Sequence, residues 1–537
     1  MTGTSFHHLH YYVENPIPMK IQIPFFSLIF TLILVSVSGL AGTQAQYSMD
    51  ALRLSKQLPG QDAHTIALGS SSVSQLQGFG SYLNNPAVAA QMPGSSFSIG
   101  LGVRNIEQQS TYLGEQTTFD DGQTGITHIG FSYKVPTVVG SLVFGGGYVQ
   151  SADYNSAFTI DAHNDFTSRT YQFLTDYTSD IAFNTFAIDD FNNELESVFE
   201  FGGFQGVDQF AETTRRGQAG EYSFFMATEF QEDFFLGLSV GIPVSRSEFE
   251  QVFIEDTPRD RAGQKVYTGE ENSGTYNIDR VFFEEKVNVD GVGLNARLGL
   301  LYTGLEFLDI GGSYTTATRW NVEETFDAFV QTRFQDVVTL DGEVIVDNDG
   351  NTFGPELSDE LNGEFSYSVT TPARIKAGAA TKGLPIADLS FSAERVNFSS
   401  IRLRDFDSAE RETQIEENNF INDNFREVWN FSAGATITAI EGVQPRLGWS
   451  MQRNPVAYIE ENDRHYISAG LGIGVNQGMS IDIGLQYGFW ETTEDLYYVD
   501  AETGIIVDDF GAPVTFIETA GQETDRFHAT VGINFRF

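Results

Sequence analysis

The sequence predicts an all-β protein: a 14-stranded antiparallel transmembrane β-barrel with an N-terminal plug in its lumen. In residues 526–537, apolar side chains alternate with small or polar ones up to the terminal Phe537. Successive side chains of a strand point to opposite faces, so this segment has one apolar face and one polar face. The same alternation recurs in residues 291–302 and 479–489. An apolar face toward lipid and a small or polar face toward a lumen is typical of outer-membrane barrels.

Composition limits the alternatives. Only 41% of the 537 residues are hydrophobic, and no stretch after residue 45 provides the roughly 18 apolar residues that a spanning helix requires. The net charge of −43, from 30 basic and 73 acidic residues, excludes nucleic acid as an expected partner because phosphate binding needs a basic face. The sequence has no cysteine, which removes thiolate metal sites. No cofactor and no metal site are expected.

The N-terminal region predicts export. Residues 1–18 read as an upstream extension, and residues 19–45 have the order of a signal peptide, with a lysine, an apolar run and small residues before cleavage after Ala45. The alternative is an uncleaved membrane anchor, since the apolar run is long for a signal peptide. Residues 46–94 then form the plug, and residues 95–537 form the barrel with long extracellular loops. The expected location is the bacterial outer membrane.

Six short connections predict the number of strands, because they alternate along the chain with long acidic connections. They lie at Thr137–Gly140, Gln231–Phe234, Thr303–Glu306, Lys382–Ala387, Ile440–Gly442 and Asn476–Gly478. With both termini in the periplasm, six such turns imply fourteen strands and seven outer loops. The expected strands are 95–104, 126–135, 140–151, 220–230, 234–246, 290–302, 306–318, 366–380, 386–396, 427–439, 443–453, 464–475, 479–491 and 525–537.

The plug carries short motifs that suggest a family. Asp50–Arg53, Ala67–Ser70 and the run Asn85, Pro86, Ala87 resemble the hatch of FadL-type long-chain fatty acid transporters, with the Bacteroidetes branch as the nearest type. The resemblance implies a 14-stranded barrel with an N-terminal hatch inside the lumen. It also implies that hydrophobic small molecules pass through the protein.

The third predicted strand contains three consecutive glycines, Gly145, Gly146 and Gly147. Glycine within a strand marks a bulge, a bend or a close backbone approach. The resembled family has a kinked third strand that opens a lateral gate, so one interpretation places a gate at these glycines. The other is that they only make room for the plug.

The expected second outer loop, residues 152–219, is rich in both aromatic and acidic residues. Five of its apolar residues have the spacing of one face of an amphipathic helix. They are Ile188, Phe191, Leu195, Val198 and Phe199. This stripe either packs against the barrel or forms a surface that captures a hydrophobic ligand.

Residues typical of catalysis are present but lack the required arrangement. His128 and Ser132 share the expected inner face of the second strand, and His528 lies on the last strand. A nucleophilic site also needs a group that orients its base, and the sequence offers no such group at a fitting position. The protein is not expected to be an enzyme.

The sequence therefore predicts an outer-membrane channel for hydrophobic small molecules, with loop capture, hatch displacement and lateral exit. Expected partners are the hydrophobic ligand, outer-membrane lipid and lipopolysaccharide, and the barrel assembly machinery through the strand that ends in Phe537. The alternative is a FadL-like barrel that serves secretion as a carrier or scaffold for surface proteins.

Overall fold

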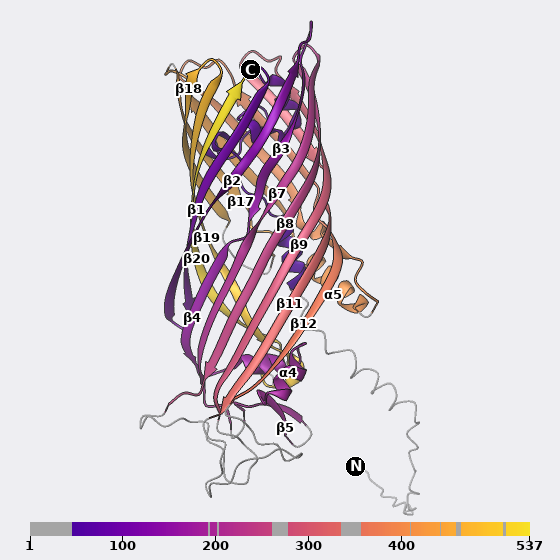
Figure 1. Cartoon of the computed structure of the whole chain (residues 1–537), viewed down its shortest axis with the longest axis vertical. Helices are drawn as coiled ribbons and strands as arrows, with labels where there is room; N and C mark the ends of the chain where they lie inside the picture. Colours follow the sequence, from indigo (N-terminus) through magenta and orange to yellow (C-terminus); the bar gives the residue numbers. More distant parts are fainter. Residues whose placement is uncertain are drawn as a thin grey trace, which may run out of the picture. The chain divides into compact units, whose positions relative to one another are not determined.

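The barrel is closed and antiparallel. The computed structural model describes residues 46–537 except 192–193, 201–202, 260–277, 335–355, 409, 441, 458–462 and 508–511. In this part of the chain, fourteen strands form the wall, and β1 (Ser96–Tyr112) closes it by pairing with β2 (Glu115–Val135) and β20 (Phe516–Arg536) (Figure 1). Seven more described strands are single segments: β7 (Val207–Gln231), β8 (Phe234–Asp256), β9 (Ile278–Tyr302), β16 (Glu427–Ile437), β17 (Val443–Gln452), β18 (Arg464–Asn476) and β19 (Met479–Val499).

The remaining four strands of the described wall are each divided into two segments. They are β3 (Leu142–Asp153) with β4 (Ser156–Asn164), β10 (Leu308–Thr315) with β11 (Arg319–Phe334), β12 (Glu356–Thr370) with β13 (Arg374–Thr381), and β14 (Ala387–Asn397) with β15 (Arg402–Arg404). Each divided strand keeps its two neighbours in the wall. The predicted fold class and strand number are therefore confirmed.

The two ends of the barrel differ in their connections. At one end, called the short-turn end, β7 and β8 are joined across Glu232 and Asp233, and the strand ends match the prediction to within two residues. At the opposite end, the long-loop end, the strands are longer than predicted: β8 continues to Asp256 instead of residue 246. The outward residues Arg246 and Glu248 of β8 are polar, so the apolar alternation stops there while backbone pairing continues.

An apolar belt surrounds the half of the barrel nearest the short-turn end. On β8, Leu236, Leu238, Val240 and Ile242 point outward with 37 to 47% of their surface exposed, while the intervening Gly237 and its inward neighbours are buried. The belt continues on the other strands through Leu101, Phe131, Phe224, Val292, Leu298, Leu447, Ile467, Leu485 and Phe527. No helix among the described residues has the length and apolar character to cross a membrane.

The segment from Gln46 to Gly94, called the hatch, lies against the inner wall. It contains α2 (Gln46–Ser55), α3 (Ala63–Ala67), η2 (Phe79–Leu83) and η3 (Pro86–Gln91). Buried Asp62 organises it by accepting hydrogen bonds from the backbone N–H groups of Thr65 and Gly80, at 2.8 and 2.6 Å. Glycines in the wall provide the space, since a side chain at Gly237 would overlap Pro86.

A second folded segment, called the outer plug, comprises the described residues within 165–206. It contains η4 (Arg169–Leu174), α4 (Ser179–Asn184), β5 (Ile188–Phe191) and β6 (Glu194–Ser197). Its apolar side chains form one buried cluster with wall residues of the long-loop end, including Phe253, Phe283 and Val330. Figure 1 shows α4 and β5 at the end opposite the C terminus.

Two expectations for residues 152–219 are corrected by this arrangement. The amphipathic helix is absent: Ile188 pairs with Ser197 in the antiparallel β5–β6 hairpin. Residues 189–193 are all Asp, Phe or Asn, which are weak helix formers, and tertiary packing overrides so short a helical pattern. The expected loop is also shorter, because β4 and the first part of β7 extend the wall.

Candidate functional site

A cavity of about 760 Å³ lies inside the barrel between the hatch and the outer plug. Met49, Arg53 and Leu58 of the hatch line one side of it, and Arg169 and Gln172 of the outer plug line another. Its walls come from β1, β3, β4, β7–β9 and β17–β20 together with the connections near them. A ligand pocket of this size is within the usual range for organic small molecules.

One side of the central cavity is apolar. The side chains there come from α2, β8, β9 and the β14–β18 region, and several belong to a buried cluster beneath α2. They are Leu52, Phe249, Val287, Val289, Phe398, Phe420 and Val456. This surface suits a hydrocarbon chain or ring, because apolar contact gains free energy in proportion to the area removed from water.

Another part of the lining is basic. Arg53 and Lys56 from the hatch, Arg215 from β7 and Arg464 from β18 all line the cavity. The Arg215 guanidinium lies 4.9 Å from the Phe249 ring centroid, and the Arg464 guanidinium lies 4.6 Å from that of Trp490. We call Arg53, Lys56, Arg215 and Arg464 the basic cluster.

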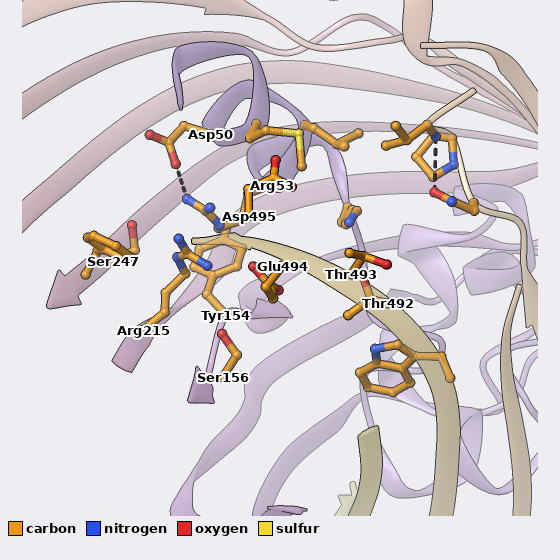
Figure 2. Close-up of a pocket in the computed structure, with 18 of the residues that line it drawn as sticks. Asp50, Arg53, Tyr154, Ser156, Arg215, Ser247, Thr492, Thr493, Glu494 and Asp495 are labelled. Atoms are coloured by element: carbon orange, nitrogen blue, oxygen red, sulfur yellow. Dashed lines mark hydrogen bonds and ion pairs between the residues drawn. The ribbon is translucent and has the colours of Figure 1, made fainter. Parts of the chain in front are cut away.

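Negative charge near the basic cluster comes from Asp50, which forms an ion pair with Arg53, and from the β19 acids that line the cavity, Glu491, Glu494 and Asp495. Figure 2 shows this pair as a dashed line, with Arg215 and Glu494 nearby. Burial, followed by the charges of Arg464 and Arg53, lowers the pKa of Lys56 well below its ordinary value. The buried Nε of Arg215 has no hydrogen-bond partner among the described residues. An anionic group would therefore be stabilised here.

The wall is interrupted beside this cavity. β2 and β3 pair from Val135 with Leu142 up to His128 with Val149, and no further β2 pair with β3 or β4 occurs in the described residues. The pairing of β2 with β1 has a register shift that leaves Thr127 unpaired. The pairing of β3 with β7 also has a register shift, between Gln150 and Ala152. The cavity reaches this place, because residues 152–156 line it.

Polar side chains hold the broken third strand from inside. Asp153, at the end of β3, forms ion pairs with Arg104 of β1 and Arg526 of β20. Arg104 also donates a hydrogen bond of 2.5 Å to Gln150, whose amide donates to Gln218 at 2.9 Å. We call the side chains of Arg104, Asp153 and Arg526 the latch.

The predicted gate glycines do not form the interruption. Gly145, Gly146 and Gly147 are paired with β2 on one side and with β7 on the other. Gly145 instead leaves space for the Phe225 ring, which stacks on Tyr82 of the hatch at a centroid distance of 4.6 Å. The geometry therefore agrees with the alternative interpretation, in which these glycines make room for the hatch.

The predicted hatch motif ties η3 to the wall. The Asn85 side chain accepts a hydrogen bond from the Ala87 backbone at 3.0 Å and donates one to the Leu300 carbonyl at 2.9 Å. Pro86 occupies the first position of η3, where its missing N–H costs no hydrogen bond. These three residues lie outside the cavity lining.

The five predicted ligand-binding residues are also outside the cavity. Ile188, Val198 and Phe199 are buried in the outer plug cluster, and Leu195 is 45% exposed. The side chain of Phe191 lies outside the described residues. The stripe therefore packs against the barrel, which was the alternative interpretation. The basic cluster was not predicted from the sequence, although Arg215 lies on the inward face of β7 in a chain with few basic residues.

The sequence matches no protein-family model and no curated protein. The structure is similar to the toluene transporter TodX of P. putida, with 14% identity over 89% of this chain and 99% of that chain, at a TM-score of 0.51. It is also similar to a FadL homologue of Pseudomonas aeruginosa, with 11% identity over 90% and 99% of the two chains, at a TM-score of 0.51. The chain thus has the fold of these two proteins, a closed 14-stranded antiparallel β-barrel.

Proposed function

We propose that the protein is an outer-membrane channel that takes up hydrophobic small molecules with an acidic group, such as long-chain fatty acids. The observation that carries this proposal is the central cavity, which joins an apolar surface, the basic cluster and the interruption of the wall. TodX, whose structure has a similar fold, is described as a toluene transporter.

The lining supports an amphipathic acid as the ligand. Val287 and Phe249 provide apolar contact, while Arg215 and Arg464 provide positive charge within the same cavity. A carboxylate held by a guanidinium gains charge-assisted hydrogen bonds, which are stronger than neutral ones. A hydrocarbon chain on the apolar side then leaves water at the same time. A neutral hydrocarbon would gain only the free energy of apolar burial.

The proposed route leaves the lumen sideways. The ligand enters past the outer plug, binds in the cavity and moves out between β2 and β3 once the latch opens. Buried hydrogen bonds to Asp62 hold the surrounding part of the hatch in place. Helix α2, in contrast, lines the cavity through Leu52 and Arg53. We therefore propose that displacement of α2, rather than of the whole hatch, accompanies passage.

The apolar belt supports location in the outer membrane. Its exposed side chains, such as Leu238 and Leu447, would be lipid-facing, because a belt of this kind on a soluble protein exposes far more apolar surface than usual. β2 carries Ile126 and Ile129 in the belt, so the interruption, which begins at Thr127, would open at membrane depth. An apolar ligand leaving there would enter lipid directly.

The test compares two neighbouring arginines. Arg215 lines the cavity, whereas Arg216 is exposed on the other face of β7. Arg215→Gln should weaken binding of a labelled long-chain fatty acid by about 10-fold to 100-fold, since losing a charged hydrogen bond costs about 1.5–3 kcal/mol. Arg216→Gln should leave binding unchanged. Equal binding by both variants would contradict the proposed ligand.

The scaffold alternative predicts a different result for the purified protein. A channel of the proposed kind should carry acyl chains that mass spectrometry detects after extraction from the purified barrel. A carrier for surface proteins should instead retain polypeptide and no acyl chain. Recovery of a stoichiometric polypeptide partner without lipid would therefore count against uptake.

A further inference from the structure

The first turn of α2 rests on a buried carboxylate from a distant helix. The backbone N–H of Ser48 donates a hydrogen bond of 2.9 Å to Oε2 of Glu417, which belongs to α5 (Arg411–Asn424). The Ser48 hydroxyl donates to the same oxygen. Glu417 is fully buried, and its Oε1 has no hydrogen-bond partner among the described residues. One oxygen of a buried carboxylate is thus left to a group not yet identified.

Aromatic contacts fix the start of α2 beside this carboxylate. The ring of Tyr47 packs edge-on against Tyr367 at a centroid distance of 5.3 Å and against Phe406 at 5.1 Å. Tyr47 is 9% exposed, and Ser48 is fully buried. The backbone of Tyr47 also forms a hydrogen bond with Glu417, and Gln46, the first residue of α2, directly precedes Tyr47.

The surroundings of Glu417 are short of positive charge. Burial raises the pKa of Glu417 to about 8, opposed by the Ser48 hydrogen bonds and reinforced by the charge of Asp50. Glu324 and Glu410 also act electrostatically on neighbouring Tyr47. Arg53 is the nearby cation, and it is already paired with Asp50. Without a cation beside it, this carboxyl would keep its proton near neutral pH, because an ionised carboxylate buried in such a place requires a cation of its own.

We propose that the α-ammonium group of Gln46, created by cleavage after Ala45, binds to Glu417. The ammonium replaces an amide nitrogen at the start of α2, where the helix N-terminus already favours a negative partner. Cleavage of the precursor would thereby add a contact that holds the start of α2 in place. This inference is independent of the ligand that the channel carries.

The ion pair has a chemical consequence for an N-terminal glutamine. A free Gln46 cyclises when its neutral α-amine attacks the side-chain amide carbon: a C–N bond forms, the amide C–N bond breaks and ammonia leaves. An α-amine has an ordinary pKa of about 8. Each unit by which an ion pair raises this pKa lowers the fraction of neutral amine about tenfold. Binding to Glu417 should therefore protect Gln46 from cyclisation.

The experiment measures the N-terminal peptide of the processed full-length barrel by mass spectrometry. The native protein should begin at Gln46 with its amide intact. Glu417→Gln should convert most chains to the cyclic form, detected as the loss of one ammonia, at a rate at least about tenfold higher. Glu412→Gln, at an exposed position of the same helix, is the matched control and should behave as the native protein.

A second variant separates the ion pair from a simple helix cap. Ser48→Ala removes the hydroxyl contact to Glu417 but keeps the carboxylate, so Gln46 should stay uncyclised. Only protein that keeps heat-modifiable migration on gels is analysed, so a misfolded variant does not enter the comparison. A native N-terminus that is already cyclic, a different N-terminal residue, or equal cyclisation in Ser48→Ala and Glu417→Gln would each overturn the proposal.

Discussion

The Nε atom of Arg104 lies 3.7 Å from a carboxylate oxygen of Asp153, and this pair joins β1 to the point where the third strand of the barrel breaks. Arg526 of β20 binds the same carboxylate oxygen. The exposed fraction of the side chain is 11% for Arg104, 2% for Asp153 and 9% for Arg526. Their contacts connect β3, on one side of the interruption, to β1 and β20, on the other side, and so fix the position of the broken strand.

Replacing the acid of the latch should destabilise the barrel locally. Asp153→Asn leaves two buried guanidinium groups without their shared counter-charge, a change that costs about 3–5 kcal/mol for buried pairs. We expect faster hydrogen exchange in β3 and faster release of a bound fatty acid. Asp161→Asn, at an exposed position of β4, should change neither. Normal rates of hydrogen exchange and of fatty-acid release in Asp153→Asn would show that the latch does not stabilise the broken strand.

The glycine triplet should prove necessary for assembly. An added Cβ at Gly147 would lie only 2.6 Å from the Gly130 backbone, whereas one at Gly125 of β2 would meet nothing within 4 Å. Overpacking of this kind costs about 1–3 kcal/mol. Gly147→Ala should lower the folded amount recovered from membranes, measured by heat-modifiable migration. Gly125→Ala is the control, and equal recovery of both variants would refute the expectation.

Removing a large buried side chain from the outer plug should loosen its docking. Phe199 is fully buried in the cluster with the long-loop end of the wall, and truncating such a residue costs about 3–5 kcal/mol. Phe199→Ala should increase hydrogen exchange throughout η4 and α4. Leu195→Ala, at a 45% exposed position of the same segment, should not. Slow exchange in both variants would mean that the plug is held by other contacts.

Docking of the outer plug should weaken as pH rises. Burial raises the pKa of Asp176 above its ordinary 3.8, although Arg169 and the hydrogen bonds from Thr178 oppose this shift. The docked state therefore holds the Asp176 proton more tightly than the undocked state. Stability from this group is complete below 3.8 and is lost as pH rises through the raised value. Hydrogen exchange of the plug, followed against pH, measures this loss.

The same pH series with Asp176→Asn provides the internal check. An amide cannot ionise, so the part of the pH dependence that comes from residue 176 should disappear. Asp180→Asn, at an exposed position of α4, should keep the native profile. A pH profile that is the same in Asp176→Asn and in the native protein would assign the effect to another group.

The barrel could be predicted from the sequence because its short-turn half repeats one simple pattern. Leu236 and Leu238 point to one face with Gly237 between them, and this alternation needs no knowledge of neighbouring strands. The long-loop half could not be predicted in the same way. From Arg246 to Glu250, the outward residues are polar, and the inward residues beyond Arg246 mix polar side chains with Phe249 and Phe253. Neither face keeps a simple pattern there, so only backbone pairing shows that the strand continues.

The site was less accessible to prediction because it is assembled across the lumen. Arg215 and Arg464 come from strands far apart in the sequence, and nothing in either segment indicates that both face one cavity. The helical spacing around Ile188 was misleading, since long-range packing outweighs local periodicity in a short segment. The interruption of the wall also lies just beyond the conspicuous glycines, where Thr127 and the Gln150–Ala152 shift carry no sequence signature.

The hatch and the outer plug line different sides of one cavity, so we expect them to act as two closures in series. Opening either one alone would then admit a ligand without creating a water-filled path along the whole lumen. In a planar bilayer, Phe199→Ala alone and deletion of hatch residues 46–94 alone should each leave ionic conductance near the baseline. The two changes combined should give a conducting pore, a strongly non-additive result that would explain how such a wide barrel preserves the permeability barrier of the cell.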